Sequence, residues 1–109
     1  MKEYKLPLDS FIGGWFIDKT VCDDIVKYFK GTPNKFKNKG HVYNSGERKI
    51  NKKIKDSLDL PISKKQFLPP FNNYRKELQD CLEKYLVRYP ESNGLERFNI
   101  NDDYNIQYY

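Results

Sequence analysis

The run from Phe71 to Tyr89, FNNYRKELQDCLEKYLVRY, constrains the fold more than any other stretch of this 109-residue chain. Its apolar residues recur at steps of three and four, the spacing that aligns side chains on one face of an α-helix. Prolines on both sides stop the helix from extending in either direction. An apolar stripe this wide must pack against another element, and we expect that element to be an apolar sheet. The residues expected to be most buried are Leu78, Leu82 and Tyr85.

A second, shorter helix is predicted from about residue 19 to residue 30, with Asp18 as its N-cap. Its apolar face includes Cys22, and Cys81 lies on the apolar face of the longer helix. Both cysteines are therefore expected to be small buried hydrophobes. Their spacing is not that of a zinc site, and nothing in the sequence indicates a compartment that would favour a disulfide.

The remaining segments give weaker signals. Residues 32–48 are rich in Gly and Asn and predict a loop with one short strand around residues 41–43. Residues 49–58 fit either a helical turn or a strand. Residues 95–109 alternate apolar and polar side chains around a turn at 101–103, which predicts a β-hairpin with its second strand starting near Tyr104. The sequence thus predicts one α+β domain spanning residues 1–109.

The net charge of +5 is distributed unevenly. Residues 1–55 hold thirteen basic against six acidic side chains, and between Lys35 and Lys55 eight basic residues accompany one acid, Glu47. Such a density predicts weak, nonspecific contact with nucleic acid or another polyanion. The candidate residues of this patch are Lys49, Lys52, Lys53 and Lys55.

The sequence gives no signal for a membrane-bound or secreted protein, and none for a histidine-dependent catalytic or metal site. No apolar run is long enough for a transmembrane helix, and the N-terminus lacks the apolar region of a signal peptide, so we expect a cytoplasmic protein without a membrane partner. His41 is the only histidine. A Ser-His-Asp catalytic triad or a transition-metal site needs several convergent groups, so His41 is interpreted as an ordinary loop residue.

Three blocks of the chain resemble a known family. They are LPLDSFIGGWFIDKTVCDDIVKYFK (Leu6 to Lys30), VYNSGERKINKKIKDSLDL (Val42 to Leu60) and FNINDDYNIQYY (Phe98 to Tyr109). Together they resemble the N-terminal half of an iron(II)/2-oxoglutarate-dependent dioxygenase. The nearest subgroup is the prolyl-hydroxylase-like set that includes small enzymes of marine bacteria and their phages.

The resemblance implies a fold and an activity. The fold would be two helices that buttress the first strands of an incomplete double-stranded β-helix, which is a jelly-roll or cupin-like sheet. The activity would be hydroxylation of a protein or peptide side chain, with iron(II) and 2-oxoglutarate as cofactors and ascorbate as a candidate third. The family's His-x-Asp/Glu pair, its second histidine and its carboxylate-binding Arg or Lys are not among these 109 residues. Whether the chain is itself an enzyme therefore stays open.

The resemblance also assigns roles near the end of the sequence. Asn105, Gln107 and Tyr109 fall on the strand that enters the family's active site, and Tyr109 is the candidate to contact the co-substrate. The isolated chain is expected not to turn over 2-oxoglutarate. It is also expected to associate with itself through the unpaired edge of this strand. The alternative functions are a small basic nucleic-acid or polyanion-binding module built on residues 35–55, and a fragment that acts only as an interaction partner.

Overall fold

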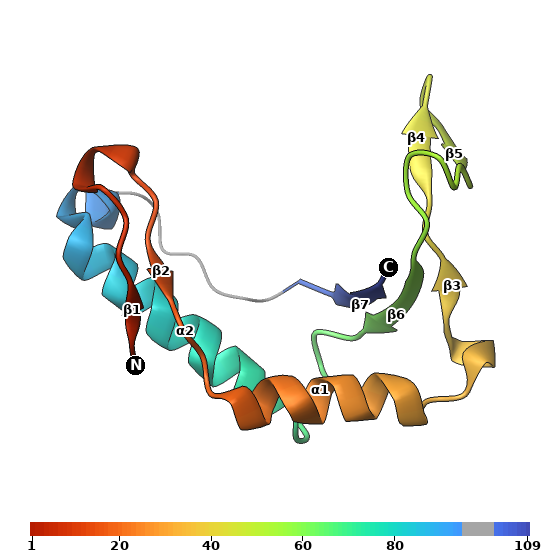
Figure 1. Cartoon of the computed structure of the whole chain (residues 1–109), viewed down its shortest axis with the longest axis horizontal. Helices are drawn as coiled ribbons and strands as arrows, with labels where there is room; N and C mark the ends of the chain where they lie inside the picture. The colour runs from red at the N-terminus through yellow and green to blue at the C-terminus, as the bar shows by residue number, and fades with distance from the viewer. Residues whose placement is uncertain (95–101) are drawn as a thin grey trace. The chain divides into compact units, whose positions relative to one another are not determined.

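A computed structural model describes residues 1–94 and 102–109 of the chain. Over these residues it contains two α-helices and seven short β-strands, which confirms a mixed α+β architecture (Figure 1). The helices are α1 (Lys19–Gly31) and α2 (Phe71–Arg88). The strands are β1 (Glu3–Tyr4), β2 (Gly14–Trp15), β3 (Asn38–Lys39), β4 (Val42–Asn44), β5 (Glu47–Lys49), β6 (Leu58–Ile62) and β7 (Tyr104–Tyr108). Short 3-10 helices occupy Leu8–Ser10, Asn34–Phe36 and Pro90–Gly94.

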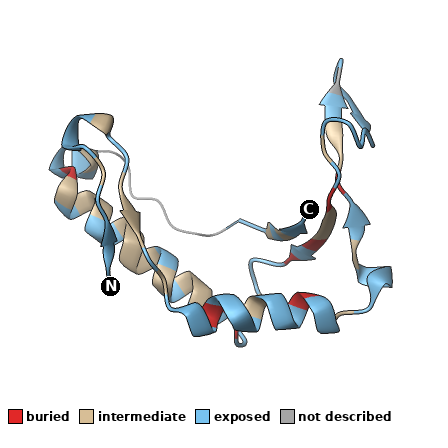
Figure 2. Cartoon of the chain, viewed as in Figure 1, coloured by how far each residue is buried: buried red, intermediate tan, exposed pale blue. Residues whose placement is uncertain are grey.

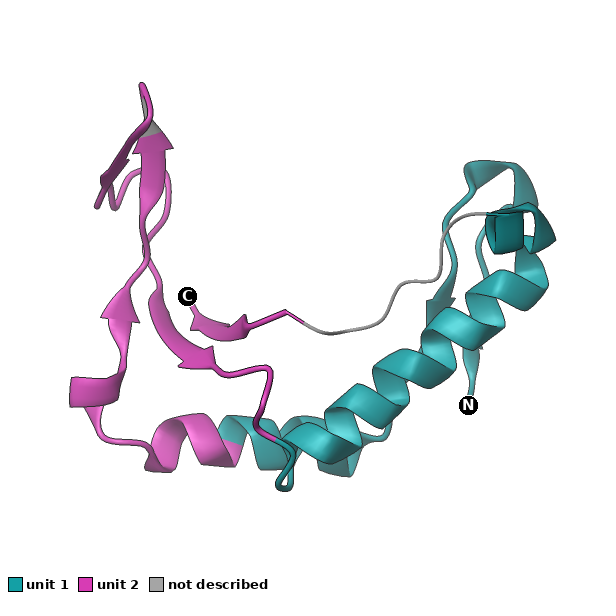
Figure 3. Cartoon of the chain, turned by 180° about the vertical axis from the view of Figure 1, so that it is seen from behind, with its two compact units in different colours: residues 1–26, 67–101 teal, residues 27–66, 102–109 magenta. Residues whose placement is uncertain are grey.

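The chain divides into two compact units, coloured separately in Figure 3. The first unit contains residues 1–26 and 67–101, and the second contains residues 27–66 and 102–109. Each unit therefore combines an early and a late part of the sequence. The expectation of a single domain over residues 1–109 stays a prediction.

In the first unit, the N-terminal segment lies along α2. Strands β1 and β2 pair antiparallel, and the loop between them is held by side chains from the end of α2. Tyr85 donates a hydrogen bond to the Phe11 carbonyl (2.8 Å), Tyr89 donates one to the Leu8 carbonyl (2.9 Å), and Arg88 donates one to the Leu6 carbonyl. Arg88 also forms an ion pair with Glu3 (2.7 Å). Three hydrogen bonds and one ion pair thus hold the N-terminal segment on the end of α2.

The burial along α2 differs from the prediction. Leu78 is 36% exposed and Leu82 and Tyr85 are only half-buried, whereas Phe71 at 1% and Tyr89 at 5% are the buried residues (Figure 2). The helix itself was predicted correctly, from Phe71 to Arg88. The choice of its most buried residues was wrong: the buried residues are Phe71 at the start of the helix and Tyr89 directly after its end. Its role as chief buttress of the sheet stays a prediction.

In the second unit, β3, β6 and β7 form an antiparallel sheet with β6 in the centre. Leu60 and Ile62 of β6 are buried, each 4% exposed. The C-terminal half of α1 covers the same side, since the ring of Phe29 stacks on Tyr108 with ring centroids 5.7 Å apart. Tyr108 pairs with Leu58 across the strands, so it shares the face of Leu58, Leu60 and Ile62. The apolar face of the sheet therefore packs on α1.

Several local predictions are now decided. Helix α1 begins at Lys19 as expected, with the Asp18 carboxylate accepting a hydrogen bond from the Thr20 amide (2.8 Å). Strand β7 confirms the predicted strand from Tyr104, and its partner among the described residues is β6. The other strand of the predicted hairpin, within residues 95–101, lies outside the described residues. Strand β4 confirms the short strand near residues 41–43. Strands β3 and β5 and the central strand β6 were missed.

The prediction for the two cysteines was wrong for one of them. Cys22 is exposed, because the side of α1 that carries it is not covered, and Cys81 is half-buried with its sulfur 3.6 Å from that of Met1. Both are free thiols. In the part of the chain that the structure describes, no helix has the length and apolarity needed to cross a bilayer.

Candidate functional site

The face of the sheet opposite α1 carries a row of polar side chains, one from each strand. Asn38 of β3 lies directly across from Asp59 of β6, and Asp59 lies directly across from Gln107 of β7. Directly opposed residues of antiparallel strands point to the same face. The row continues at Tyr109, whose hydroxyl donates a hydrogen bond to the Gln107 side-chain carbonyl (3.2 Å). We take this polar row as the candidate site.

Asp59 is the centre of a tight cluster beside this row. It accepts a hydrogen bond from the Ser57 hydroxyl (2.8 Å) and forms an ion pair with the Lys55 ammonium (3.4 Å). The side chains of Lys55 and Asp59 are only 21% and 13% exposed, so the pair is shielded from water. The Gly40 amide donates to the Ser57 carbonyl (2.9 Å) and ties β3 to the same cluster. These contacts hold the Asp59 carboxylate in one position on the polar face.

The cluster also shows why a glycine precedes β4. A Cβ added at Gly40 would lie 2.1 Å from the Ser57 hydroxyl oxygen and 2.9 Å from Cε of Lys55. The Gly40 backbone is not left-handed, so the requirement is steric. The sequence prediction did not include Asp59, Ser57 or Gly40 among its site residues. The spacing of Asp56 and Asp59, which could suggest a carboxylate pair, was the signal available for Asp59.

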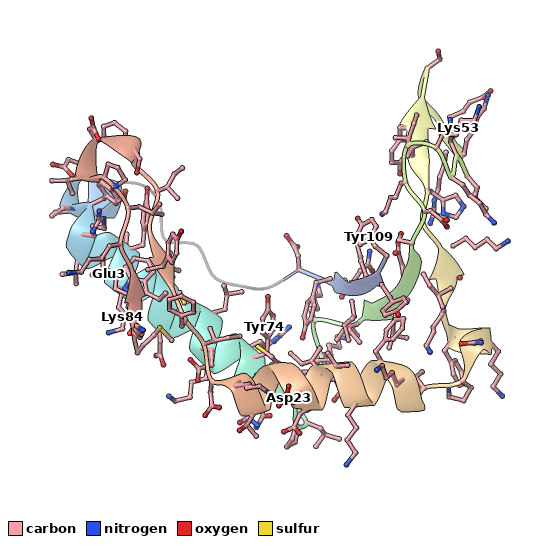
Figure 4. The ribbon with its side chains drawn as sticks, viewed as in Figure 1. Glu3, Asp23, Lys53, Tyr74, Lys84 and Tyr109 are labelled. Atoms are coloured by element: carbon pink, nitrogen blue, oxygen red, sulfur yellow. The ribbon has the colours of Figure 1, made fainter. Side chains whose placement is uncertain are left out.

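The structure divides the four lysines of the predicted patch. Lys55 is paired with Asp59, whereas Lys49, Lys52 and Lys53 are exposed on the β4–β5 hairpin and the turn after it. Figure 4 labels Lys53 in this turn. Lys49 forms an ion pair with Glu47 (3.2 Å), and both side chains are solvent-exposed. An exposed pair of this kind contributes little to stability. Three of the four lysines therefore remain available to a partner, and Lys55 has a structural role.

The last two site residues predicted from the resemblance, Asn105 and Tyr109, lie on β7 and directly after it, at the edge of the sheet. Tyr109 is 74% exposed and Asn105 is exposed, so neither is enclosed by the residues described. The outer edge of β7 has no paired strand among the described residues. The co-substrate role of Tyr109 and self-association through this edge both stay predictions.

The donor groups do not fit an iron centre. Across residues 1–94 and 102–109, no three His, Cys, Asp or Glu side chains lie close enough together to hold a metal ion. His41, in the segment that links β3 to β4, is half-buried. A facial iron site needs two imidazoles and a carboxylate. No reaction step through iron is therefore assigned to this chain.

A hollow of about 500 Å³ lies in the first unit beside the loop held by α2. Its lining includes Leu8, Phe11, Tyr89 and Pro90. The Arg88 side chain at its edge is already engaged by Glu3 and the Leu6 carbonyl. The exposed carboxylates Asp9 and Glu91 complete the lining. We prefer the polar row as the site, because its carboxylate Asp59 is shielded and held by Ser57 and Lys55.

Comparison with known proteins adds no assignment, because no family model, no curated protein and no solved structure matches the chain.

Proposed function

We propose that this chain is the N-terminal part of an iron(II)/2-oxoglutarate-dependent dioxygenase that hydroxylates a protein or peptide side chain. The observation that carries the proposal is the pairing of β6 with β7. Strand β6 begins within the second block of the resemblance and extends two residues beyond it, and β7 lies within the third block; the two strands are far apart in the sequence. In the fold they are neighbours, with Leu58 opposite Tyr108 and Leu60 opposite Ile106.

The first block of the resemblance joins the same assembly. Its last helix, α1, contributes Phe29, which is 6% exposed and stacks on Tyr108. A sheet with one face packed on a helix and the other face polar suits the start of a double-stranded β-helix, whose inner face surrounds the ligand. The polar row and the α1 cover support this finer description of the fold.

Within the proposal, this chain supplies scaffold and co-substrate contacts. The iron ligands would come from residues other than these 109, as would the basic group that holds the 2-oxoglutarate carboxylate. Bound iron would supply oxygen activation, with ascorbate as a candidate reductant. Tyr109 would donate a hydrogen bond from its phenol to an oxygen of the co-substrate. Without co-substrate the same O–H donates to the Gln107 side-chain carbonyl (3.2 Å), so on binding it would turn from Gln107 to the co-substrate oxygen.

The first test is the coding sequence beyond Tyr109. The proposal expects a His-x-Asp/Glu pair and a second histidine in the same reading frame. The product of that frame should release succinate from 2-oxoglutarate when iron(II) and ascorbate are present, and the 109 residues alone should not. A frame without these ligands, or a complete product without turnover, would overturn the proposal.

A matched pair of variants tests Tyr109 in the active product. Tyr109→Phe should raise the KM for 2-oxoglutarate roughly ten-fold, which is the loss of one hydrogen bond to a charged group. Tyr108→Phe is the control, because the Tyr108 ring lies on the opposite face against Phe29. Equal effects of the two substitutions would remove Tyr109 from the site without affecting the proposed activity.

A further inference from the structure

The hairpin β4–β5 and the turn after it, residues 42–54, form a projecting element that we call the basic hairpin (Figure 1). Val42, Tyr43 and the following residue pair with Lys49, Arg48 and Glu47 in antiparallel register. The two turn residues, Ser45 and Gly46, have φ of 52° and 82°. Positive φ at both positions is the turn geometry that matches the twist of a two-residue hairpin. The element is thus a defined shape and can present side chains in fixed positions.

The basic hairpin carries more positive charge than its own contacts neutralise. Arg48, Lys49, Lys52 and Lys53 are all exposed, and the only acid of the element, Glu47, pairs with Lys49. Among the described residues, Arg48, Lys52 and Lys53 form no ion pair. A partner with negative charge would therefore meet positive groups that no internal acid occupies.

Apolar side chains are exposed among these charges. Tyr43 is 78% exposed, Ile54 is 71% and Ile50 is 50%. Solvated basic segments do not need large apolar residues, whereas an interface stabilises a complex by burying them. The combination of free charge and exposed apolar groups indicates a docking surface.

The chemistry of the surface favours a polypeptide over a nucleic acid. Single-stranded nucleic acid is held by aromatic rings that stack on successive bases. Of the three exposed apolar side chains, only Tyr43 is aromatic, and Ile50 and Ile54 suit aliphatic side chains of a protein. Tyr43 lies directly opposite Arg48, so the two side chains share one face. A guanidinium there can bind a carboxylate through two parallel hydrogen bonds.

We propose that the basic hairpin docks an acidic polypeptide segment that also carries apolar side chains. Arg48 binds a carboxylate of that segment, Tyr43 packs beside it, and Ile50 and Ile54 take its apolar residues. Lys52 and Lys53 add attraction that falls as salt rises. This docking goes beyond the proposed oxygenase activity and does not require it, because it needs neither iron nor co-substrate.

The test uses the whole 109-residue chain and three fluorescent probes: a peptide of repeated Glu-Glu-Leu, a peptide of repeated Glu-Glu-Ser, and an oligothymidylate of the same charge. Fluorescence anisotropy should rank the Glu-Glu-Leu peptide as the tightest. Arg48→Ala should weaken its binding about ten-fold, as expected for one charge-assisted contact. Arg48→Lys should weaken binding less than Arg48→Ala does but still leave it below the parent affinity, because lysine keeps the positive charge but cannot form two parallel hydrogen bonds. Tyr43→Ala should weaken binding with less dependence on salt.

Two controls make the outcome decisive. Lys84→Ala removes an exposed charge on α2, outside the basic hairpin, and should leave peptide binding unchanged (Figure 4). Circular dichroism of every variant checks that the fold is retained. Tighter binding of oligothymidylate would overturn the proposal in favour of nucleic acid. Equal binding of the two peptides, no binding at low salt, or indifference to both Arg48→Ala and Tyr43→Ala would overturn it outright.

Discussion

Replacing Gly40 with alanine tests the cluster that positions Asp59 on the polar face. The new Cβ would lie 2.1 Å from the Ser57 hydroxyl oxygen, far inside van der Waals contact. Ser57 is itself buried, at 8% exposure, so its hydroxyl has little space to move into. The least costly response is rotation of Ser57, which breaks its hydrogen bond to Asp59 (2.8 Å). The substitution therefore acts through one identifiable contact.

The magnitude follows from that contact. Losing a hydrogen bond to a charged group costs about 1.5–3 kcal/mol, and residual crowding against Cε of Lys55, 2.9 Å away, adds strain. Overpacked sites of this kind typically lose roughly 1–3 kcal/mol. We expect Gly40→Ala to lower the free energy of unfolding by about 2–3 kcal/mol.

A double-mutant cycle isolates the contact. Ser57→Ala removes the clashing hydroxyl and should cost about 1.5–2 kcal/mol on its own. Adding Gly40→Ala to it should then cost less than about 1 kcal/mol, a coupling of roughly 1.5 kcal/mol between the two sites. Urea unfolding followed by far-ultraviolet circular dichroism measures all four proteins. Strictly additive costs, or a Gly40→Ala protein as stable as the parent, would refute the reasoning.

Three further predictions follow from other contacts. Lys53→Glu should weaken retention on heparin without loss of stability. Lys55→Glu should mainly destabilise the fold, because Lys55 is paired with a shielded carboxylate. Elution from heparin by salt measures the first effect and urea unfolding measures the second. Burial, assisted by the carboxylates of Glu77 and Asp80, raises the pKa of the Cys81 thiol, which lowers its thiolate fraction at pH 8. Half-buried Cys81 should therefore react with a disulfide reagent more slowly than exposed Cys22, as single Cys→Ser variants would show. Arg88→Ala should release the N-terminal segment, and faster trypsin cleavage there would check it.

The sequence by itself determined the elements whose signal is local. The three-and-four spacing predicts α2, Asp18 and the apolar positions after it predict α1, and the alternation after Tyr104 predicts β7. The spacing of apolar residues can be read from neighbouring positions alone, so it predicts an element without information about the rest of the chain. The identity of a strand's partner has no such signature, and the pairing of β7 with β6 is visible only in the fold.

Tertiary structure alone decided which residues are buried and which groups meet. The same apolar stripe of α2 leaves Leu78 36% exposed and buries Phe71, which is 1% exposed. Lys55 and Lys53 are equivalent in the sequence pattern, yet one is paired beside Asp59 and the other is free for a partner. Burial and pairing depend on which distant segment arrives at a position, and no window of neighbouring residues contains that information.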